Sequence, residues 1–106
     1  MSTKDKSAWI KDILGEVRRH IKARKYRITN HAQERQDKHQ LTLPNLLFIL
    51  STGFHEKEKT LYSNEFQTWK YAIRGNTIDQ SGEFRIIVAF EKEMAVLTVI
   101  KLEVRK

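Results

Sequence analysis

The stretch that decides the fold is EFRIIVAFEKEMAVLTVIKLEV, residues 83–104. Apolar side chains recur with period two in residues 84–90 and again in residues 94–104, and the polar break Glu91-Lys92-Glu93 separates the two runs. This pattern predicts a β-hairpin. Because both faces of each run are largely apolar, we expect the hairpin to occupy the centre of a sheet.

Three polar side chains interrupt the apolar surface of this hairpin: Arg85, Thr98 and Lys101. Thr98 is in phase with Val96, whereas Lys101 is out of phase with both. Regular alternation therefore predicts Arg85 and Lys101 on one open surface, which Arg74 shares. It predicts Thr98 on the opposite face, unless a β-bulge shifts the register.

Length and composition predict a single domain over residues 1–106, with a basic N-terminal helix in 1–25 and an α+β core in 26–104. The sequence has no cysteine, which suits a reducing compartment. No run approaches the roughly 20 apolar residues of a membrane span, and the N-terminus lacks a signal-peptide pattern. We therefore expect a cytoplasmic protein that has no membrane partner.

The positive charge is concentrated in the first part of the chain. The net charge is +7, and residues 1–40 hold 11 Lys and Arg against 5 Asp and Glu. This asymmetry fits a polyanionic partner, either nucleic acid or an acidic protein. A solvated basic helix face without a partner is the alternative.

Three helices are expected in the first half. Ser7 is the expected N-cap of a helix that runs to about residue 25, and Asn30 that of a second helix over about 31–38. Thr42 is the expected N-cap of a third helix, with Pro44 in its first turn and its end at Thr52-Gly53.

Strands follow the helices. Residues 26–29 are an edge strand or an extended link, and residues 66–74 form a strand that precedes the hairpin. This order predicts an α+β fold whose N-terminal helices pack on a three- to four-stranded antiparallel sheet.

The second helix carries a first candidate site. His31, Arg35 and His39 recur four residues apart, on one helix face. A histidine and an arginine one turn apart could move a proton and hold a phosphate. The separation of His31 and His39 is about 12 Å along the axis, too far for both to bind one metal ion. His31 could instead be a capping or packing residue.

The sheet carries a second candidate site, formed by Lys70, Arg74, Arg85 and Lys101. Arg74 and Arg85 are expected on adjacent strands, where two like charges cost free energy unless an anion lies between them. A phosphodiester is such an anion, and arginine suits it. A basic face without a ligand is the alternative.

Aromatic residues suggest contacts with RNA bases. Tyr62, Trp69 and Tyr71 alternate with basic residues that include Lys70 and Arg74. Trp69 and Tyr71 share the phase of Ile73, so these two rings are expected in the core, and Tyr62 is the freer ring.

Motifs for other chemistries are missing: there is no glycine-rich phosphate loop, zinc-protease helix or nucleophile elbow. The sequence also lacks a dense carboxylate cluster for a two-metal nuclease site. An enzyme that acts on nucleic acid is therefore expected to need no metal or other cofactor. RNA is then the favoured substrate, because its own 2′-hydroxyl supplies the nucleophile.

Two sets of short sequence motifs in residues 26–104, called outlines below, resemble those of known families. The run Ile28-Thr29-Asn30-His31-Ala32 followed by Arg35, with a later glycine and a last strand that contains Thr98, is similar to the domain of unknown function 4258. The run Thr60-Leu61-Tyr62-Ser63, followed by Trp69, Gly82 and Lys101, resembles the MqsR-type mRNA interferase toxins. Both families belong with the RelE-like toxin fold.

The resemblance implies a metal-independent endoribonuclease, an mRNA interferase that an antitoxin protein silences. The MqsR outline carries basic functional residues over to Lys57 and Lys101. This chain departs from the MqsR pattern at two positions: Lys70 stands where the family usually has an amide side chain, and Arg85 stands where it has a tyrosine. The other outline carries functional roles over to His31, Arg35 and Thr98. The two outlines thus name different residues.

The leading hypothesis is a toxin-like ribonuclease of RelE or MqsR type, with RNA or ribosome-associated mRNA as substrate. The expected catalytic residues are His31, Arg74, Arg85 and Lys101. The expected RNA-binding residues are Arg18, Arg19, Arg35, Lys57, Tyr62, Lys70 and Thr98. The first alternative is a non-catalytic RNA- or DNA-binding module that uses the first helix. The second is an interaction domain that docks an acidic partner.

Overall fold

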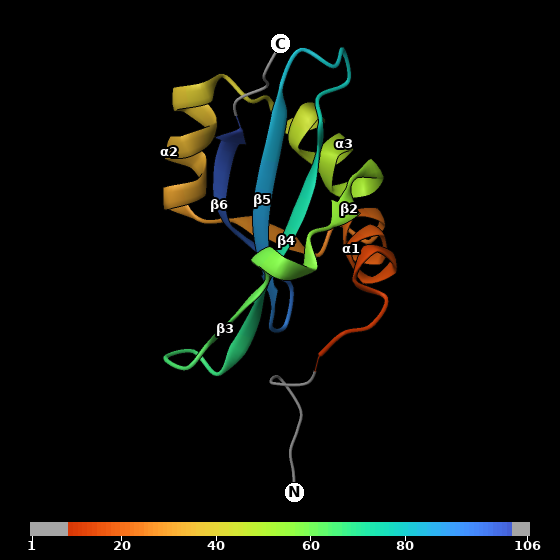
Figure 1. The fold of residues 1–106 in the computed structure, drawn as a ribbon, viewed down its shortest axis with the longest axis vertical. Coiled ribbons are helices and arrows are strands. Elements are labelled where there is room, and N and C mark those ends of the chain that lie inside the picture. Colours follow the sequence, from red (N-terminus) through yellow and green to blue (C-terminus); the bar gives the residue numbers. More distant parts are fainter. Residues whose placement is uncertain (1–8, 103–106) are drawn as a thin grey trace, which may run out of the picture.

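The structure is a computed structural model, and it describes residues 9–102 (Figure 1). Along the chain, the elements are α1 (Ile13–Lys22), β1 (Tyr26–Ile28), α2 (Asn30–His39), α3 (Leu43–Thr52), β2 (Phe54–His55), a short 3₁₀ helix η1 (Lys57–Lys59), β3 (Leu61–Ser63), β4 (Thr68–Asn76), β5 (Glu83–Phe90) and β6 (Met94–Leu102). The α+β class and the order of helices before the main strands are as predicted.

The sheet is larger than predicted. Within residues 9–102 it has six strands, in the order β1-β6-β5-β4-β2, with β3 also paired to β4. It is mixed, because β1 runs parallel to β6 while the other pairs are antiparallel. The prediction of three or four antiparallel strands was therefore wrong. β1 is the expected edge strand in residues 26–29, whereas β2 and β3 were not predicted and have only two and three residues, too few for a period-two pattern to mark them.

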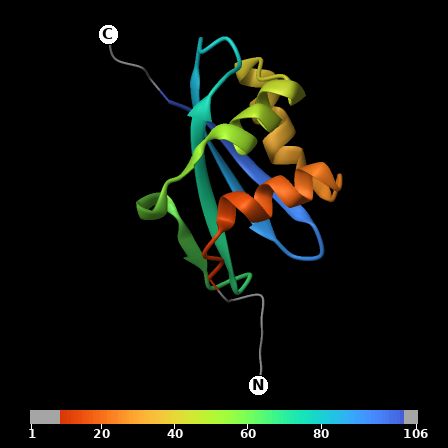
Figure 2. The same cartoon turned by 90° about the vertical axis from the view of Figure 1, so that its right-hand side faces the viewer.

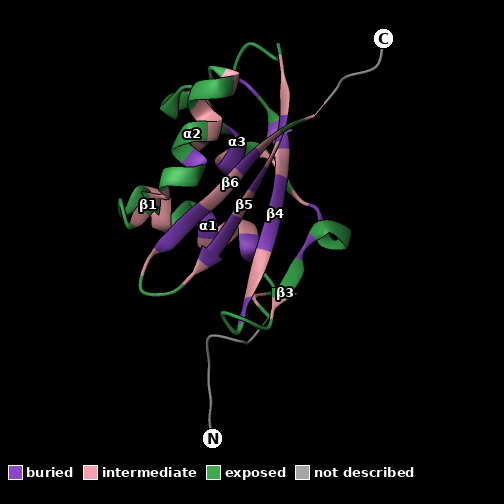
Figure 3. Cartoon of the chain, turned by 90° about the vertical axis from the view of Figure 1, so that its left-hand side faces the viewer, coloured by how far each residue is buried: buried purple, intermediate pink, exposed green. Residues whose placement is uncertain are grey.

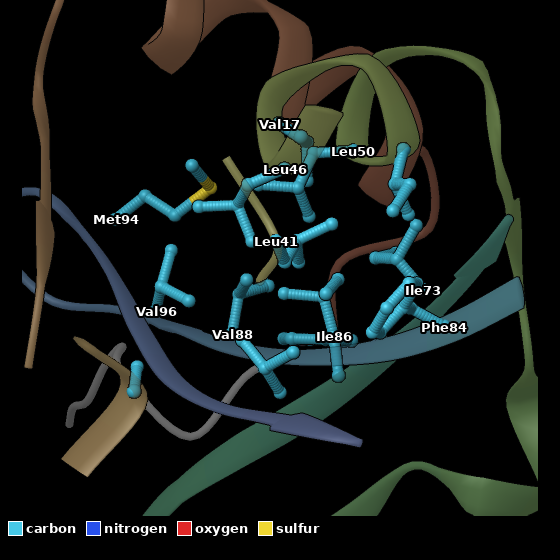
Figure 4. Packing of buried hydrophobic residues seen from close by; sticks show 14 of the residues in the cluster. Val17, Leu41, Leu46, Leu50, Ile73, Phe84, Ile86, Val88, Met94 and Val96 are labelled. Carbon is cyan, nitrogen blue, oxygen red and sulfur yellow. The ribbon is translucent and has the colours of Figure 1, made fainter. Parts of the chain in front are cut away.

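One face of the sheet is covered by helices and the other is largely open. Figure 2 shows α1 and α3 on one side of the sheet and η1 on the other. The core fills the helix side with side chains such as Val17, Leu46, Ile86 and Val96, all fully buried (Figure 4). We call the side opposite the helices the open face. Figure 3 shows buried and half-buried residues alternating along β4, β5 and β6.

The helix boundaries correct two predicted caps. Asp12 caps α1, with its side chain accepting a hydrogen bond from the Gly15 amide, while the expected cap Ser7 lies outside the described residues. Thr29, rather than Asn30, caps α2. Thr42 caps α3 as predicted, Pro44 lies in its first turn, and the helix ends at Thr52.

The central hairpin is confirmed, but a β-bulge in β6 changes its faces. Ile87 pairs with Thr98 and Val88 pairs with Val96, so Leu97 is the extra residue. Directly opposed residues share a face. Thr98 therefore lies on the open face.

Lys101 pairs with the buried Phe84 and so lies on the helix side. The prediction from regular alternation, that Lys101 shares a surface with Arg85 and that Thr98 lies opposite, was wrong, and the exception made for a β-bulge applies. The bulge inverts the alternation after Val96.

Candidate functional site

Paired residues of β4, β5 and β6 form rows across the open face, perpendicular to the strands. In the first row Arg74 of β4 pairs with Arg85 of β5, which pairs with Ile100 of β6. In the next row Ala72 pairs with Ile87, which pairs with Thr98. Thr98 is therefore the diagonal neighbour of Arg85, at a backbone separation of about 7–8 Å.

A buried carboxylate lies between the two arginines. Glu56 precedes η1, is only 4% exposed, and reaches over the open face. Its Oε1 accepts from Arg85 Nε at 2.6 Å, and its Oε2 accepts from Arg85 Nη2 at 3.1 Å and from Arg74 Nη1 at 3.0 Å. The sequence predicted a phosphodiester between these arginines; in the structure the intervening anion is Glu56.

Arg74 is held by a second carboxylate as well. Its Nε and Nη2 donate to Glu83 at 2.8 and 3.2 Å, so all three of its guanidinium nitrogens bind carboxylates. Arg85 differs, because its Nη1 has no hydrogen bond to any residue in 9–102. Two arginines and two glutamates make this cluster neutral overall. Arg74 therefore holds Glu56 in place, and Arg85 keeps one donor for a ligand.

The ionisation of the cluster follows from these contacts. Hydrogen bonds from Arg85 and then Arg74 hold the pKa of the Glu56 carboxyl below its usual range, although burial opposes this shift. Glu83 and Glu56 raise the pKa of Arg74, and Glu56 raises that of Arg85. Glu56, Arg74 and Arg85 are therefore charged at neutral pH.

His31 reaches the same face from the edge of the sheet. Its Nε2 lies 3.1 Å from Thr98 Oγ1, and the imidazole is otherwise exposed. Its Nδ1 has no hydrogen bond within the described chain. An exposed imidazole that is oriented through one nitrogen keeps the other for proton transfer.

α2 is held along the free edge of β6 by hydrogen bonds to the strand, and Figure 1 shows the two elements side by side. The Thr29 hydroxyl donates to the Leu97 carbonyl at 3.2 Å, and Arg35 Nε donates to the Val99 carbonyl at 3.4 Å. These contacts cover carbonyls that an edge strand would otherwise expose. Arg35 therefore has a structural role at this edge.

Lys101 and His39 lie on the helix side of this edge. His39 stacks edge-on against Phe84 at 6.2 Å between ring centroids, and its Nε2 is buried without a partner among the described residues. Burial first, and then the nearby charges of Arg35, Lys38 and Lys101, lower the pKa of His39. Lys101 is therefore separated from Arg85 by the sheet.

The remaining predicted residues are dispersed. Trp69 packs against the core as expected, and Tyr62 contacts it edge-on, with 5.2 Å between centroids. Lys57 is exposed on η1, and Lys70 lies on the open face near Phe66. Arg18 donates to the Ser51 carbonyl and Arg19 pairs with Glu16, both on the exposed side of α1. The structure thus brings His31 into contact with Thr98 and joins Arg74 to Arg85 through Glu56, and it places the two pairs on the same face of the sheet.

Sequence reasoning missed Glu56, the residue that organises this site. It stands in the charged run His55-Glu56-Lys57-Glu58-Lys59, where nothing distinguishes it from its exposed neighbour Glu58. The sequence did contain one indication. The predicted pairing of Arg74 with Arg85 requires an anion between them, and a carboxylate of this chain could supply it.

Within residues 9–102, no group of three or more His, Asp or Glu side chains is arranged to hold a metal ion. No helix in this part of the chain has the length and apolar character needed to cross a membrane. Comparisons of the chain with protein-family models, with curated proteins and with solved structures find no match.

Proposed function

We propose that this protein is a metal-independent endoribonuclease that cleaves single-stranded RNA on the open face. The observation that carries the proposal is that His31, oriented by Thr98, and Arg85 lie on the same face of two neighbouring strands. The imidazole is 3.1 Å from the Thr98 hydroxyl, and Thr98 is the diagonal neighbour of Arg85 on the same face. A proton-transfer group and a cation on one accessible surface are what this reaction needs.

The chemistry requires no group beyond the RNA and these side chains. His31 Nδ1 takes the proton of the 2′-hydroxyl, and the 2′-oxygen forms a bond to phosphorus. The bond from phosphorus to the 5′-oxygen breaks, and that oxygen takes a proton from water. The hydroxide that remains takes the proton held by His31, which restores the neutral imidazole. The products are a 2′,3′-cyclic phosphate and a 5′-hydroxyl end. The free Nη1 of Arg85 stabilises the charge that develops on the phosphoryl oxygens.

Each supporting residue has a defined part. Thr98 fixes the orientation of the His31 ring through Nε2. Glu56 fixes the Arg85 guanidinium through two hydrogen bonds, and Arg74 fixes Glu56. Preorganised groups of this kind need little rearrangement when the charge develops. Lys101, on the other side of the sheet, is not assigned a catalytic part.

The resemblance to mRNA interferase toxins supplies the fold and the partner that go with this proposal. We place the protein with the RelE-like toxins, in the cytoplasm, with an antitoxin that would silence it by covering the open face. Residues that supported the resemblance, His31, Arg35 and Thr98, all meet at the junction of α2 and β6.

The test is cleavage of a labelled single-stranded RNA without divalent metal, with the products identified by their ends. Wild-type protein is expected to give 2′,3′-cyclic phosphate ends, and His31→Ala is expected to cut at least about 100-fold more slowly. His20→Ala, a histidine on α1, is the matched control. Intact RNA with wild-type protein, with and without ribosomes, would refute the proposal.

The second candidate, a non-catalytic nucleic-acid module, rests on the exposed basic side of α1. Neutralising Arg18, Arg19 and Lys22 would then abolish binding, and binding would fall steeply with salt. The ribonuclease proposal expects these substitutions to leave the rate at saturating RNA unchanged.

A further inference from the structure

The open face contains a hollow beside the candidate site. Its volume is about 290 Å³, and it lies between the turn before β4 and the turn between β5 and β6. Ala89 and Ala95, direct partners on β5 and β6, form its floor together with Leu97. The hollow exists because two alanines face each other where neighbouring rows carry larger side chains.

The hollow has a cation at each end and an aromatic wall, and the carboxylate of Glu91 lies beside the cation of Arg27. Arg27 of β1 pairs with Ala95, and Lys70 directly precedes Tyr71, the partner of Val88, so that Lys70 stands beside Ala89. One row across four strands therefore reads Arg27, Ala95, Ala89, Lys70. Phe66 forms part of the wall, is 59% exposed, and lies with its ring centroid 5.7 Å from Lys70 Nζ.

The cations are available to a ligand. Arg27 contacts Glu91 at 3.8 Å and Glu93 at 3.5 Å, but all three side chains are about half exposed. Exposed ion pairs of this kind contribute little free energy, so a phosphate can replace the carboxylates. Lys70 has no carboxylate partner within residues 9–102.

We infer that this hollow binds one base of single-stranded RNA. A flat apolar floor and an exposed aromatic ring offer stacking to any base, and flanking cations contact the backbone phosphates on either side. The volume lies just below the usual range for drug-sized ligands, which suits a single heterocycle. This inference rests on the proposed function, because it makes the hollow the base-recognition site of the same reaction.

The hollow and the candidate site are joined through β6. Leu97 lines the hollow, and the next residue, Thr98, orients His31. A nucleotide with its base in the hollow thus has its ribose and phosphate next to Thr98. The base held there is the one adjacent to the cleaved bond, so the hollow sets the sequence preference.

The first experiment measures binding to uncut ligands. The four nucleoside monophosphates are titrated into labelled protein and the backbone amide signals are followed by NMR. The amides of Ala89 and Ala95 are expected to shift. Phe66→Ala is expected to weaken binding about tenfold, the loss typical of one base–aromatic stack. Phe54→Ala removes an exposed ring outside the hollow and is the matched control.

Shifts confined to α1, or equal affinity for wild type and Phe66→Ala, would overturn the inference. The inference would also be overturned if a co-purifying protein, and no nucleotide, shifted the amide signals of Ala89 and Ala95.

The second experiment separates this inference from the proposed function. His31→Ala should still bind nucleotides in the hollow while it loses cleavage. Phe66→Ala should need about tenfold more RNA for half-maximal cleavage and should show a weakened preference for the base next to the cut. If His31→Ala cuts like wild type, the proposed function fails and the hollow stands. If Phe66→Ala keeps both affinity and base preference, the hollow fails and the proposed function stands.

Discussion

Arg74 and Arg85 stand directly opposite each other on β4 and β5, and their guanidinium groups share one buried carboxylate, that of Glu56. Two like charges on neighbouring strands would repel without it. The shared carboxylate ties η1 to the open face and leaves Arg85 with one unused donor. Stability and the candidate chemistry therefore depend on the same residue.

Glu56→Ala is expected to lower the free energy of unfolding by about 3 kcal/mol, because it leaves Arg85 without its counter-charge in a partly buried position. Urea unfolding followed by circular dichroism measures this change. Glu58→Ala, an exposed carboxylate on η1, is the control and should change it by less than about 0.5 kcal/mol. Equal stability of the two variants would contradict the assigned role of Glu56.

Acid should weaken the fold through the same group. Since the folded state lowers the pKa of Glu56, its contribution to stability is complete above the unfolded value of about 4.3 and is lost as the pH falls through the lower folded value. Unfolding free energies measured in steps below pH 5 should therefore decline less steeply in Glu56→Gln than in wild type. Parallel curves would exclude Glu56 as the source.

His39 predicts a second pH dependence, nearer neutrality. Its pKa is lowered in the folded protein by burial and by the charges of Arg35, Lys38 and Lys101, so the unfolded state binds a proton first. Stability should be complete above the unfolded value of about 6.5 and should fall as the pH drops below it. Thermal unfolding between pH 7.5 and 5.5 should show this decline in wild type and in His31→Gln. It should be smaller in His39→Leu, where the half-buried His55, whose pKa burial and Lys57 also lower, still contributes.

The Thr29 hydroxyl makes two hydrogen bonds, one that caps α2 and one to β6. Comparison with a residue that only caps a helix separates the two contributions to stability. The Thr29 hydroxyl accepts from the Ala32 amide as the cap of α2 and donates to the Leu97 carbonyl of β6. Thr42 caps α3 but has no contact of this kind with a strand. Thr42→Ala should therefore cost about 1 kcal/mol, and Thr29→Ala about twice that. Chemical denaturation measures both, and a smaller loss for Thr29→Ala would contradict the contribution of the hydrogen bond to β6.

Gly53 is required where α3 meets β4. A Cβ atom there would lie 2.4 Å from the Arg74 carbonyl oxygen and 2.7 Å from that of Ile49, and backbone atoms cannot move aside. Gly53→Ala should destabilise the fold by about 1–3 kcal/mol, as overpacked positions do. Gly82→Ala, which meets only the ring edge of Phe84 at 3.2 Å, should cost less in the same denaturation assay.

The sequence predicted long elements better than the contacts between distant ones. The hairpin and its polar break matched β5 and β6 closely, because period two continues over eight or nine residues in each strand. Alternation of apolar and polar residues could not predict β2 and β3, because strands of two or three residues are too short to show it.

The candidate site was predicted in part, for a similar reason. His31 and Thr98 are 67 residues apart, and the register that joins them depends on a bulge that the side chains do not mark. The adjacency of Arg74 and Arg85 followed from strand order alone and was confirmed. Glu56 reaches them from outside the sheet, so no alternation could assign it.

The extra residue in β6 determines the chemistry of two surfaces at once. Because Leu97 is left out of the ladder, a threonine stands on the open face and a lysine stands on the helix side beside α2. In a regular ladder, with Leu97 paired to Ile87, the two would exchange sides, and the net charge of each surface would change without any new charged residue. Loss of the bulge is thus equivalent to moving a positive charge through the sheet.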